Sequence, residues 1–263
     1  MKAPAGIAVS VWLLPLGLLL LAAPLWLHWV EPALFLALNA FCAGLPAVLW
    51  ASLSLLGNGW GVLGATAPLL LLAPRLMLAW LCAAPFAIGL TRLGKGWIES
   101  ARPAALLDHA QMQIVGEALY KVSMPSGHTL TAFAVASALY FALPAASRWR
   151  QGWLFALAAA VGLSRVAVGA HWPGDVAVGA CLGLLSGMLA QLLLGRIGPQ
   201  HWQPGSWSLR LVALLLLLAA FHLASEALDF AEAQPMQYVL VGVILGTLLL
   251  FVRRQWRRAS ASA

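Results

Sequence analysis

A histidine, a carboxylate and an arginine stand close together in one stretch of this chain. His171 is followed by Asp175 across Trp172-Pro173-Gly174, and Arg165 precedes it near the end of an apolar run. A charge inside an apolar helix of a membrane protein is costly and usually functional. If Pro173 begins a helix, Asp175 falls in its first turn, where a carboxylate is favoured. Asp175 can then accept the Nδ1 proton of His171 and leave Nε2 with its lone pair, as in an activated nucleophile. A capping aspartate beside a core histidine is the alternative.

A second histidine, His128, ends the stretch Pro125-Ser126-Gly127-His128. Ser126 suits the N-cap of a helix, and Gly127 would let an anion approach the backbone N–H groups of its first turn. An ordinary helix start explains the serine and the glycine equally well. It does not explain an imidazole in the first turn of an apolar helix.

Two cations, Lys95 and Arg102, lie seven residues apart in a polar stretch. If that stretch is helical, they share one face two turns apart, and Pro103 would end the helix. A lysine and a planar arginine fork on one face could converge on a dianionic phosphate. The alternative is a pair of cations that extend toward water at a membrane surface.

Together these stretches resemble the three-part signature of the type-2 phosphatidic acid phosphatase superfamily. They read K-x6-R-P from Lys95, P-S-G-H from Pro125, and S-R-x5-H-x3-D from Ser164, in the family's order and without departure at a signature position. The resemblance covers about residues 30–195. It implies a lipid phosphatase that works through a phosphohistidine.

The resemblance also implies a role for each residue. His171 would be the nucleophile, oriented by Asp175, and His128 would protonate the leaving oxygen and then activate water. Phosphate oxygens would be bound by the remaining signature residues, namely Lys95, Arg102, Ser126, Gly127 and Arg165. These roles agree with the general dependence of phosphoryl transfer on positioning and electrostatic stabilisation.

The composition independently indicates a membrane protein. Of the 263 residues, 62% are hydrophobic and only 9% are charged, whereas soluble domains carry about 25% charged residues. The formal charge of +7 could indicate nucleic acid as a partner, but the basic residues lie at the ends of apolar runs, as membrane topology requires. We therefore expect membrane lipids and a lipid phosphate as partners, and no nucleic acid.

The apolar runs predict an all-α integral membrane protein. One interfacial helix is expected over 32–54 near the N-terminus, and transmembrane helices are expected over 7–29, 58–74, 76–93, 126–144, 152–169, 173–195, 208–225 and 236–252. The resemblance implies that the first six transmembrane helices form the six-helix core usual in that superfamily. This organisation predicts a core over 1–200, followed by two extra C-terminal transmembrane helices and a basic tail over 201–263.

Charge placement predicts the orientation. With both termini cytoplasmic, ten of the fifteen basic residues, Lys2 among them, fall on the inner side and all eight acids fall on the outer side. All three motifs then share the extracytoplasmic face. The resemblance and this topology together indicate a bacterial inner membrane.

Neither a metal nor a cofactor is expected, because the His, Cys, Asp and Glu residues do not cluster in the sequence as metal ligands do.

The compact outer loop favours a small headgroup. Undecaprenyl diphosphate is favoured, and phosphatidylglycerophosphate, phosphatidic acid and lipid A phosphates stay open. The same residues would serve a transferase that passes phosphate from lipid to lipid. An anion transporter using Lys95, Arg102 and Arg165 is disfavoured, because no repeat is visible and the polar residues lie at one interface.

Overall fold

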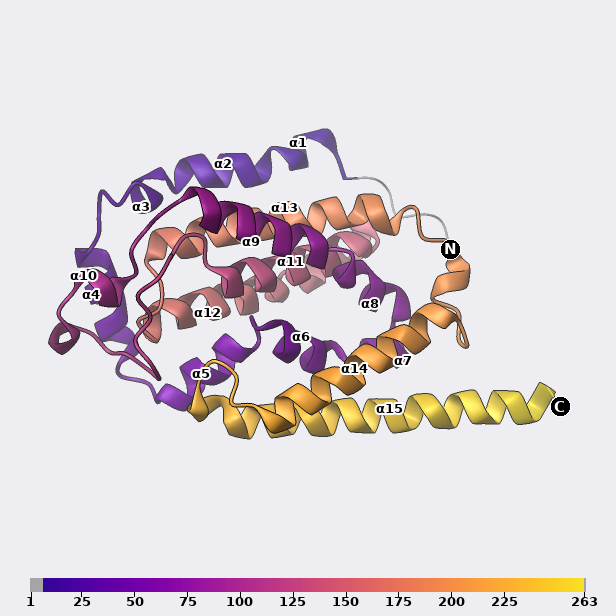
Figure 1. Cartoon of the computed structure of the whole chain (residues 1–263). Coiled ribbons are helices and arrows are strands. Elements are labelled where there is room, and N and C mark those ends of the chain that lie inside the picture. The colour runs from indigo at the N-terminus through magenta and orange to yellow at the C-terminus, as the bar shows by residue number, and fades with distance from the viewer. Residues whose placement is uncertain (1–6, 263) are drawn as a thin grey trace.

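The apolar runs form helices in the computed structural model, which describes residues 7–262 and contains no strand among them (Figure 1). Within residues 7–262, four segments are long and apolar enough to cross a membrane. They are Pro74–Trp97, which comprises α8 (Pro74–Leu81) and α9 (Ala84–Trp97); α13 (Pro173–Leu194); α14 (Trp207–Ser225); and Ala231–Arg258, which contains most of α15 (Gln234–Ser262). The chain is therefore an all-α integral membrane protein, as predicted.

Fewer long spans are found than the eight predicted. Helices α11 (Gly127–Ala142) and α12 (Trp153–Ala167) are apolar but have 16 and 15 residues, whereas a full crossing takes about 20. The segment predicted to be one interfacial helix is instead α4 (Ala33–Cys42) and α5 (Ala47–Leu55), bent by 109°. That bent pair would be a fifth span.

Prolines divide other expected helices, because a proline lacks the N–H that continues the helical ladder. The run 7–29 forms three short helices, α1 (Val9–Trp12), α2 (Leu14–Leu21) and α3 (Ala23–Trp26), and the last two carry Pro15 and Pro24 in their first turns. Pro68 likewise separates α6 from α7. The remaining elements are α6 (Gly59–Thr66), α7 (Leu69–Leu72), α10 (Pro103–Leu106), η1 (His109–Gln111), η2 (Ala145–Gln151), η3 (Pro199–His201) and η4 (Ala231–Ala233).

Helices α11 and α13 form the centre of the fold and run parallel. Gly179, Gly183 and Gly187 recur every four residues along one face of α13. A Cβ at Gly179 would lie 2.7 Å from the Ser126 carbonyl oxygen, and a Cβ at the other two would meet α11 backbone further along. Small residues at this spacing let two helix backbones approach closely in a membrane. The two helices therefore begin at the same end of the molecule.

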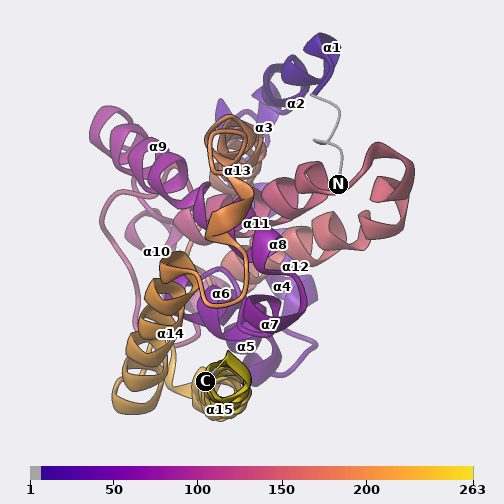
Figure 2. The same cartoon turned by 90° about the vertical axis from the view of Figure 1, so that its right-hand side faces the viewer.

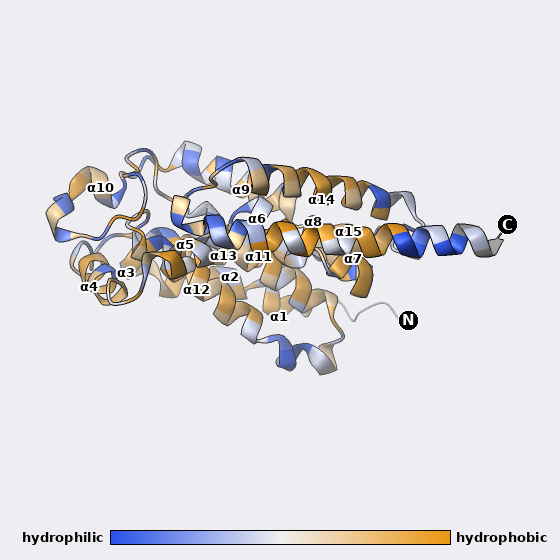
Figure 3. Cartoon of the chain, turned by 90° about the horizontal axis from the view of Figure 1, so that it is seen from below, coloured by the Kyte–Doolittle hydropathy of each residue, from blue (hydrophilic) through white to orange (hydrophobic). Residues whose placement is uncertain are grey.

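The C-terminal hairpin of α14 and α15 packs against α6, and η4 in its connecting loop packs against α5. The end-on view shows this hairpin on the α6–α7 side of the molecule, away from α13 (Figure 2). In Figure 3, hydrophobic positions run along the middle of the helices, while hydrophilic positions gather at the loop end near α10 and along the last turns of α15. Lys2, used to predict the orientation, lies outside the described residues.

Candidate functional site

The start of α13 brings His171 and Asp175 together. His171 lies in the loop between α12 and α13, and Asp175 is the third residue of α13. Its Oδ2 lies 3.3 Å from the Nδ1 of His171 and accepts the Trp172 backbone N–H at 2.9 Å. Both side chains are almost completely buried. The predicted reach of Asp175 back to His171 is observed.

Ser123 completes this arrangement and was missed by the sequence reasoning. Its hydroxyl donates to the Asp175 Oδ2 at 2.5 Å and lies 3.3 Å from the His171 Nδ1. It is fully buried, although it belongs to the loop between α10 and α11. No sequence signal distinguishes it from other loop serines.

The other ring nitrogen of His171 faces a cation. The Nη1 of Arg102 lies 3.5 Å from the His171 Nε2. That guanidinium is fixed by two backbone carbonyls, because Nη1 donates to Ala170 at 2.8 Å and Nε donates to Lys121 at 2.5 Å. Burial lowers the pKa of His171 to about 3, against the opposing effect of Asp175. The ring is therefore neutral at physiological pH, with Nε2 beside a positive charge.

Lys95 and Arg102 approach the site from two helices rather than from one. Lys95 lies in the last turn of α9, which ends at Trp97, and Arg102 is the N-cap of α10. The conditional prediction of one shared helix face is therefore wrong. Pro103 begins α10 instead of ending a helix, which fits its missing N–H and fixed φ.

Arg165 is buried in the last turn of α12, and its Nη1 donates to the Ser54 hydroxyl. Its guanidinium carbon lies 5.4 Å from the centre of the Phe230 ring. Its Nε is buried and has no hydrogen-bond partner among the described residues. Such a donor is rare in a folded interior. Arg165 and Arg102 both act electrostatically on Lys95, so three cations share this end of the molecule.

The start of α11 lies beside the start of α13. Ser126 occupies the N-cap, as predicted, but its hydroxyl accepts from the Thr129 hydroxyl at 2.9 Å and does not cap the backbone. The first N–H groups of a helix have no partner within it. Gly127 is the first residue of α11 and adds no side chain there. An anion at this end would meet the N-termini of both helices, which favour negative charge.

His128 is held by a residue far along the chain. Its Nε2 lies 2.9 Å from the Oδ2 of Asp229, which also accepts from the Asn58 side chain at 2.8 Å. Sequence reasoning missed both partners. The predicted topology gave one indication of a contact with Asp229, because it placed Asp229 on the same side of the membrane as the three motifs. Within residues 7–262, no group of three or more His, Cys, Asp or Glu could hold a metal ion.

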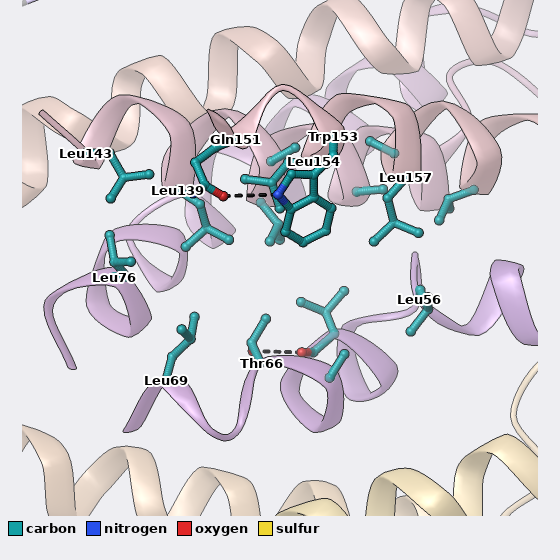
Figure 4. Close-up of a pocket in the computed structure, with 17 residues that line it drawn as sticks. Leu56, Thr66, Leu69, Leu76, Leu139, Leu143, Gln151, Trp153, Leu154 and Leu157 are labelled. Atoms are coloured by element: carbon teal, nitrogen blue, oxygen red, sulfur yellow. Dashed lines mark hydrogen bonds between the residues drawn. The ribbon is translucent and has the colours of Figure 1, made fainter. Parts of the chain in front are cut away.

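An apolar groove with a volume of about 350 Å³ lies between α6–α7 and α11–α12 (Figure 4). Leu69, Leu76 and Leu139 are among its lining side chains. Its lining reaches Leu56 and Val161, and the adjoining Gly57 fits closely between Val161 and His128. A Cβ at Gly57 would lie 2.7 Å from both the Val161 Cγ1 and the His128 carbonyl oxygen. One end of the groove therefore borders the backbone of His128.

Comparisons with known proteins agree with the signature. The chain is 35% identical over 114 residues to a lipid A 1-phosphatase of Rhizobium johnstonii, covering 41% of this chain and 44% of the relative. It is 42% identical over 67 residues to the bacitracin transport permease protein BcrC of Bacillus licheniformis, covering 25% and 30%. The chain spans less than half the length of the curated relatives it matches.

A solved PAP2-type phosphatidylglycerolphosphate phosphatase from Bacillus subtilis is 23% identical, with a TM-score of 0.48 over 70% of this chain and 98% of that one. The segment 75–199 matches the sequence model of the PAP2 superfamily. That segment contains all three signature stretches, from Lys95 to Asp175. The predicted resemblance is thus confirmed for this segment, which matches the PAP2 superfamily.

Proposed function

We propose that this protein is a membrane lipid phosphatase that removes a headgroup phosphate through a phosphohistidine on His171. The observation that carries the proposal is the state of that ring. It is buried and neutral, with Nδ1 held by Asp175 and Nε2 facing Arg102. A neutral imidazole with one oriented nitrogen is a competent nucleophile toward phosphorus.

The proposed reaction has two steps. The Nε2 lone pair of His171 attacks phosphorus while the bond from phosphorus to the lipid oxygen breaks. His128 gives its proton to that oxygen, and the dephosphorylated lipid leaves. His128 then takes a proton from water as the water oxygen attacks phosphorus and the P–N bond breaks. Inorganic phosphate is released, and both histidines return to their starting states.

The cations bind the phosphate oxygens. Lys95, Arg102 and Arg165 surround the site from α9, α10 and α12, and Ser126 and Gly127 contribute the start of α11. Charge-assisted bonds from such donors strengthen as negative charge develops on the transferring group. The unpartnered Nε of Arg165 supports this role, because a phosphate oxygen would satisfy it.

The substrate we propose is a lipid whose phosphate lies at the membrane surface. Relatives named lipid A 1-phosphatase support a lipid A-type phosphate at least as well as the undecaprenyl diphosphate favoured by the sequence. In this proposal a hydrocarbon chain of the substrate lies in the apolar groove, whose end borders His128.

We also propose that residues 1–200 form the phosphatase core, in a bacterial inner membrane, with the site on the extracytoplasmic side and both termini cytoplasmic. The basic residues of the tail, from Arg253 to Arg258, support this orientation because cytoplasmic segments favour Lys and Arg.

The test is phosphate release by the detergent-purified protein, with chelator present, across a lipid panel. The panel holds lipid A, undecaprenyl diphosphate, phosphatidylglycerophosphate and phosphatidic acid. We expect release from at least one lipid, and we expect His171→Ala to abolish both release and the phosphoenzyme. His201→Ala is the matched control, since that histidine is exposed beyond α13 and pairs with Ser208. Undiminished release by His171→Ala would overturn the proposal. Label that passes to a second lipid instead of to water would identify a transferase.

A further inference from the structure

The C-terminal hairpin supplies a carboxylate to the site. Asp229 lies in the loop between α14 and η4, outside the segment 75–199 that matches the family. Its Oδ2 lies 2.9 Å from the Nε2 of His128. The side chains of both residues are mostly shielded, with 19% of His128 and 26% of Asp229 exposed.

The loop fixes this carboxylate from several directions. Asp229 has a φ of 57°, a left-handed conformation that is uncommon for non-glycine residues, although aspartate adopts it more readily than most. Asn58 donates to the same Oδ2 at 2.8 Å. The next residue, Phe230, is buried with its ring 5.4 Å from the Arg165 guanidinium carbon. A Cβ at Gly116 would lie only 2.8 Å from that ring, so the loop after α10 closes over it.

The charged groups that act on His128 are two cations and the carboxylate of Asp229. Arg165 from α12 and Lys95 from α9 act on the ring as cations, and Asp229 acts on it as an anion. Burial would raise the pKa of Asp229, but the hydrogen bonds from His128 and Asn58 and the charge of Arg165 hold it below its usual range. The carboxylate is therefore ionised while it contacts the imidazole.

We propose that Asp229 is the positioning residue for proton transfer by His128. It holds Nε2–H, which leaves Nδ1 to give a proton to the leaving oxygen and later to take one from water. It also stabilises the imidazolium that is present before the first transfer and forms again in the second. Each histidine of the site then has one ring nitrogen bound to a carboxylate. This inference rests on the proposed function and assigns a part of that function to residues 201–263.

The first test separates protonation from attack on phosphorus. Asp229→Asn is assayed with phosphatidic acid, whose alkoxide leaving group needs a proton, and with p-nitrophenyl phosphate, whose nitrophenolate leaves without one. We expect kcat for phosphatidic acid to fall about 10- to 100-fold while the burst of nitrophenolate, one per active site, persists. The basic limb of the kcat profile should move to lower pH, because the lost carboxylate no longer favours the protonated ring. Asp229→Glu should restore part of the rate.

The matched control is Glu226→Gln, an acid of the same loop that pairs with His222 at 3.3 Å and should leave both substrates unaffected. Asn58→Ala, which removes only the second hydrogen bond to Asp229, should give a smaller loss in the same direction. An unchanged kcat and pH profile in Asp229→Asn, with wild-type turnover intact, would overturn the role of Asp229 and leave the phosphatase proposal standing.

A second measurement does not depend on turnover. In protein carrying ¹³C-labelled histidine, the His128 signal is assigned by its loss in His128→Gln. We expect the wild-type ring to show the Nε2–H tautomer and a higher pKa than in Asp229→Asn. Identical His128 signals and titrations in the two proteins would exclude the contact, whether or not the enzyme turns over. A wild type without turnover would count against the proposed function alone.

Discussion

The backbone N–H of Ser126 donates to the carbonyl oxygen of Asp175 at 3.1 Å. This bond joins the first turn of α11 directly to the first turn of α13. The start of α11, proposed to bind phosphate, is thereby held next to the start of α13, beside the proposed nucleophile His171. The close packing of α11 against the glycine face of α13, formed by Gly179, Gly183 and Gly187, supports this contact. A shift between the two helices would separate them, and 1 Å of misplacement is costly for catalysis.

Enlarging the glycine face should therefore damage both stability and activity. A Cβ at Gly183 would meet the backbone of Leu130 and the Cβ of Phe133, so Gly183→Ala is expected to destabilise the fold by about 1–3 kcal/mol, as overpacked cores do. Thermal unfolding in detergent measures this. Gly242→Ala on α15 is the control, because nothing lies within 4 Å of its added Cβ. Equal melting temperatures for the two variants would refute the close approach of α11 and α13.

Removing the Ser123 hydroxyl should slow turnover without abolishing it. Ser123→Ala leaves the buried Asp175 with one donor fewer, a loss of about 1–3 kcal/mol, or roughly 10- to 100-fold in kcat if it is felt in the transition state. Steady-state kinetics on the preferred lipid measures the effect. Ser147→Ala, whose exposed hydroxyl bonds only the Pro144 carbonyl, should behave as wild type. A Ser123→Ala enzyme at full rate would show that Asp175 needs no such support.

Arg102 should not tolerate lysine. Its fork spans the carbonyls of Ala170 and Lys121 while facing the His171 ring, and an ammonium cannot reproduce that geometry. We expect Arg102→Lys to lower kcat/KM about 10- to 100-fold, as loss of a charge-assisted pair does. Arg92→Lys on the exposed face of α9 controls for charge at the surface. Retention of wild-type kcat/KM would argue that any cation suffices at this position.

Acidification should destabilise the fold through His171. Its folded pKa of about 3 lies below the ordinary value of 6.5, so the unfolded state binds more protons between these values. The stability from the neutral buried ring is complete above pH 6.5 and is lost progressively as pH falls toward 3. Melting temperatures across this window should fall more steeply for the wild type than for His171→Gln. Parallel curves for both proteins would contradict the burial of a neutral imidazole.

Filling the apolar groove should discriminate between substrates by their tails. Ala65→Trp places a large ring at an exposed lining position. We expect kcat/KM for a long-chain lipid phosphate to fall about 10-fold, a cost of about 1.4 kcal/mol, while p-nitrophenyl phosphate is turned over as before. Leu211→Trp, on the exposed face of α14, carries the same ring elsewhere in the membrane region. An equal effect of Ala65→Trp on both substrates would place the substrate chain outside the groove.

Contacts between residues that are close in the sequence could be predicted, whereas contacts between residues far apart in the sequence could not. Asp175 reaches His171 because four residues and one helix start separate them, which local rules describe. Lys95 and Arg102 would share one helix face if the stretch between them were helical, but α9 ends at Trp97 and Pro103 starts another helix. Ser123 and Asp229 depend on how loops fold over the site. The 101 positions between His128 and Asp229 leave no periodic pattern that could join them.

The parallel arrangement of α11 and α13 also means that His128 and His171 stay on the same side of a membrane only if the number of crossings between them is even. Both helices begin at the site, so the chain between His128 and His171 leaves that end of the molecule along α11 and returns to it along α12. A single added or lost crossing between these histidines would put them on opposite sides of the bilayer. Membrane segments can therefore be gained or lost within this stretch only in pairs, whereas a hairpin appended after α13 changes nothing in that count.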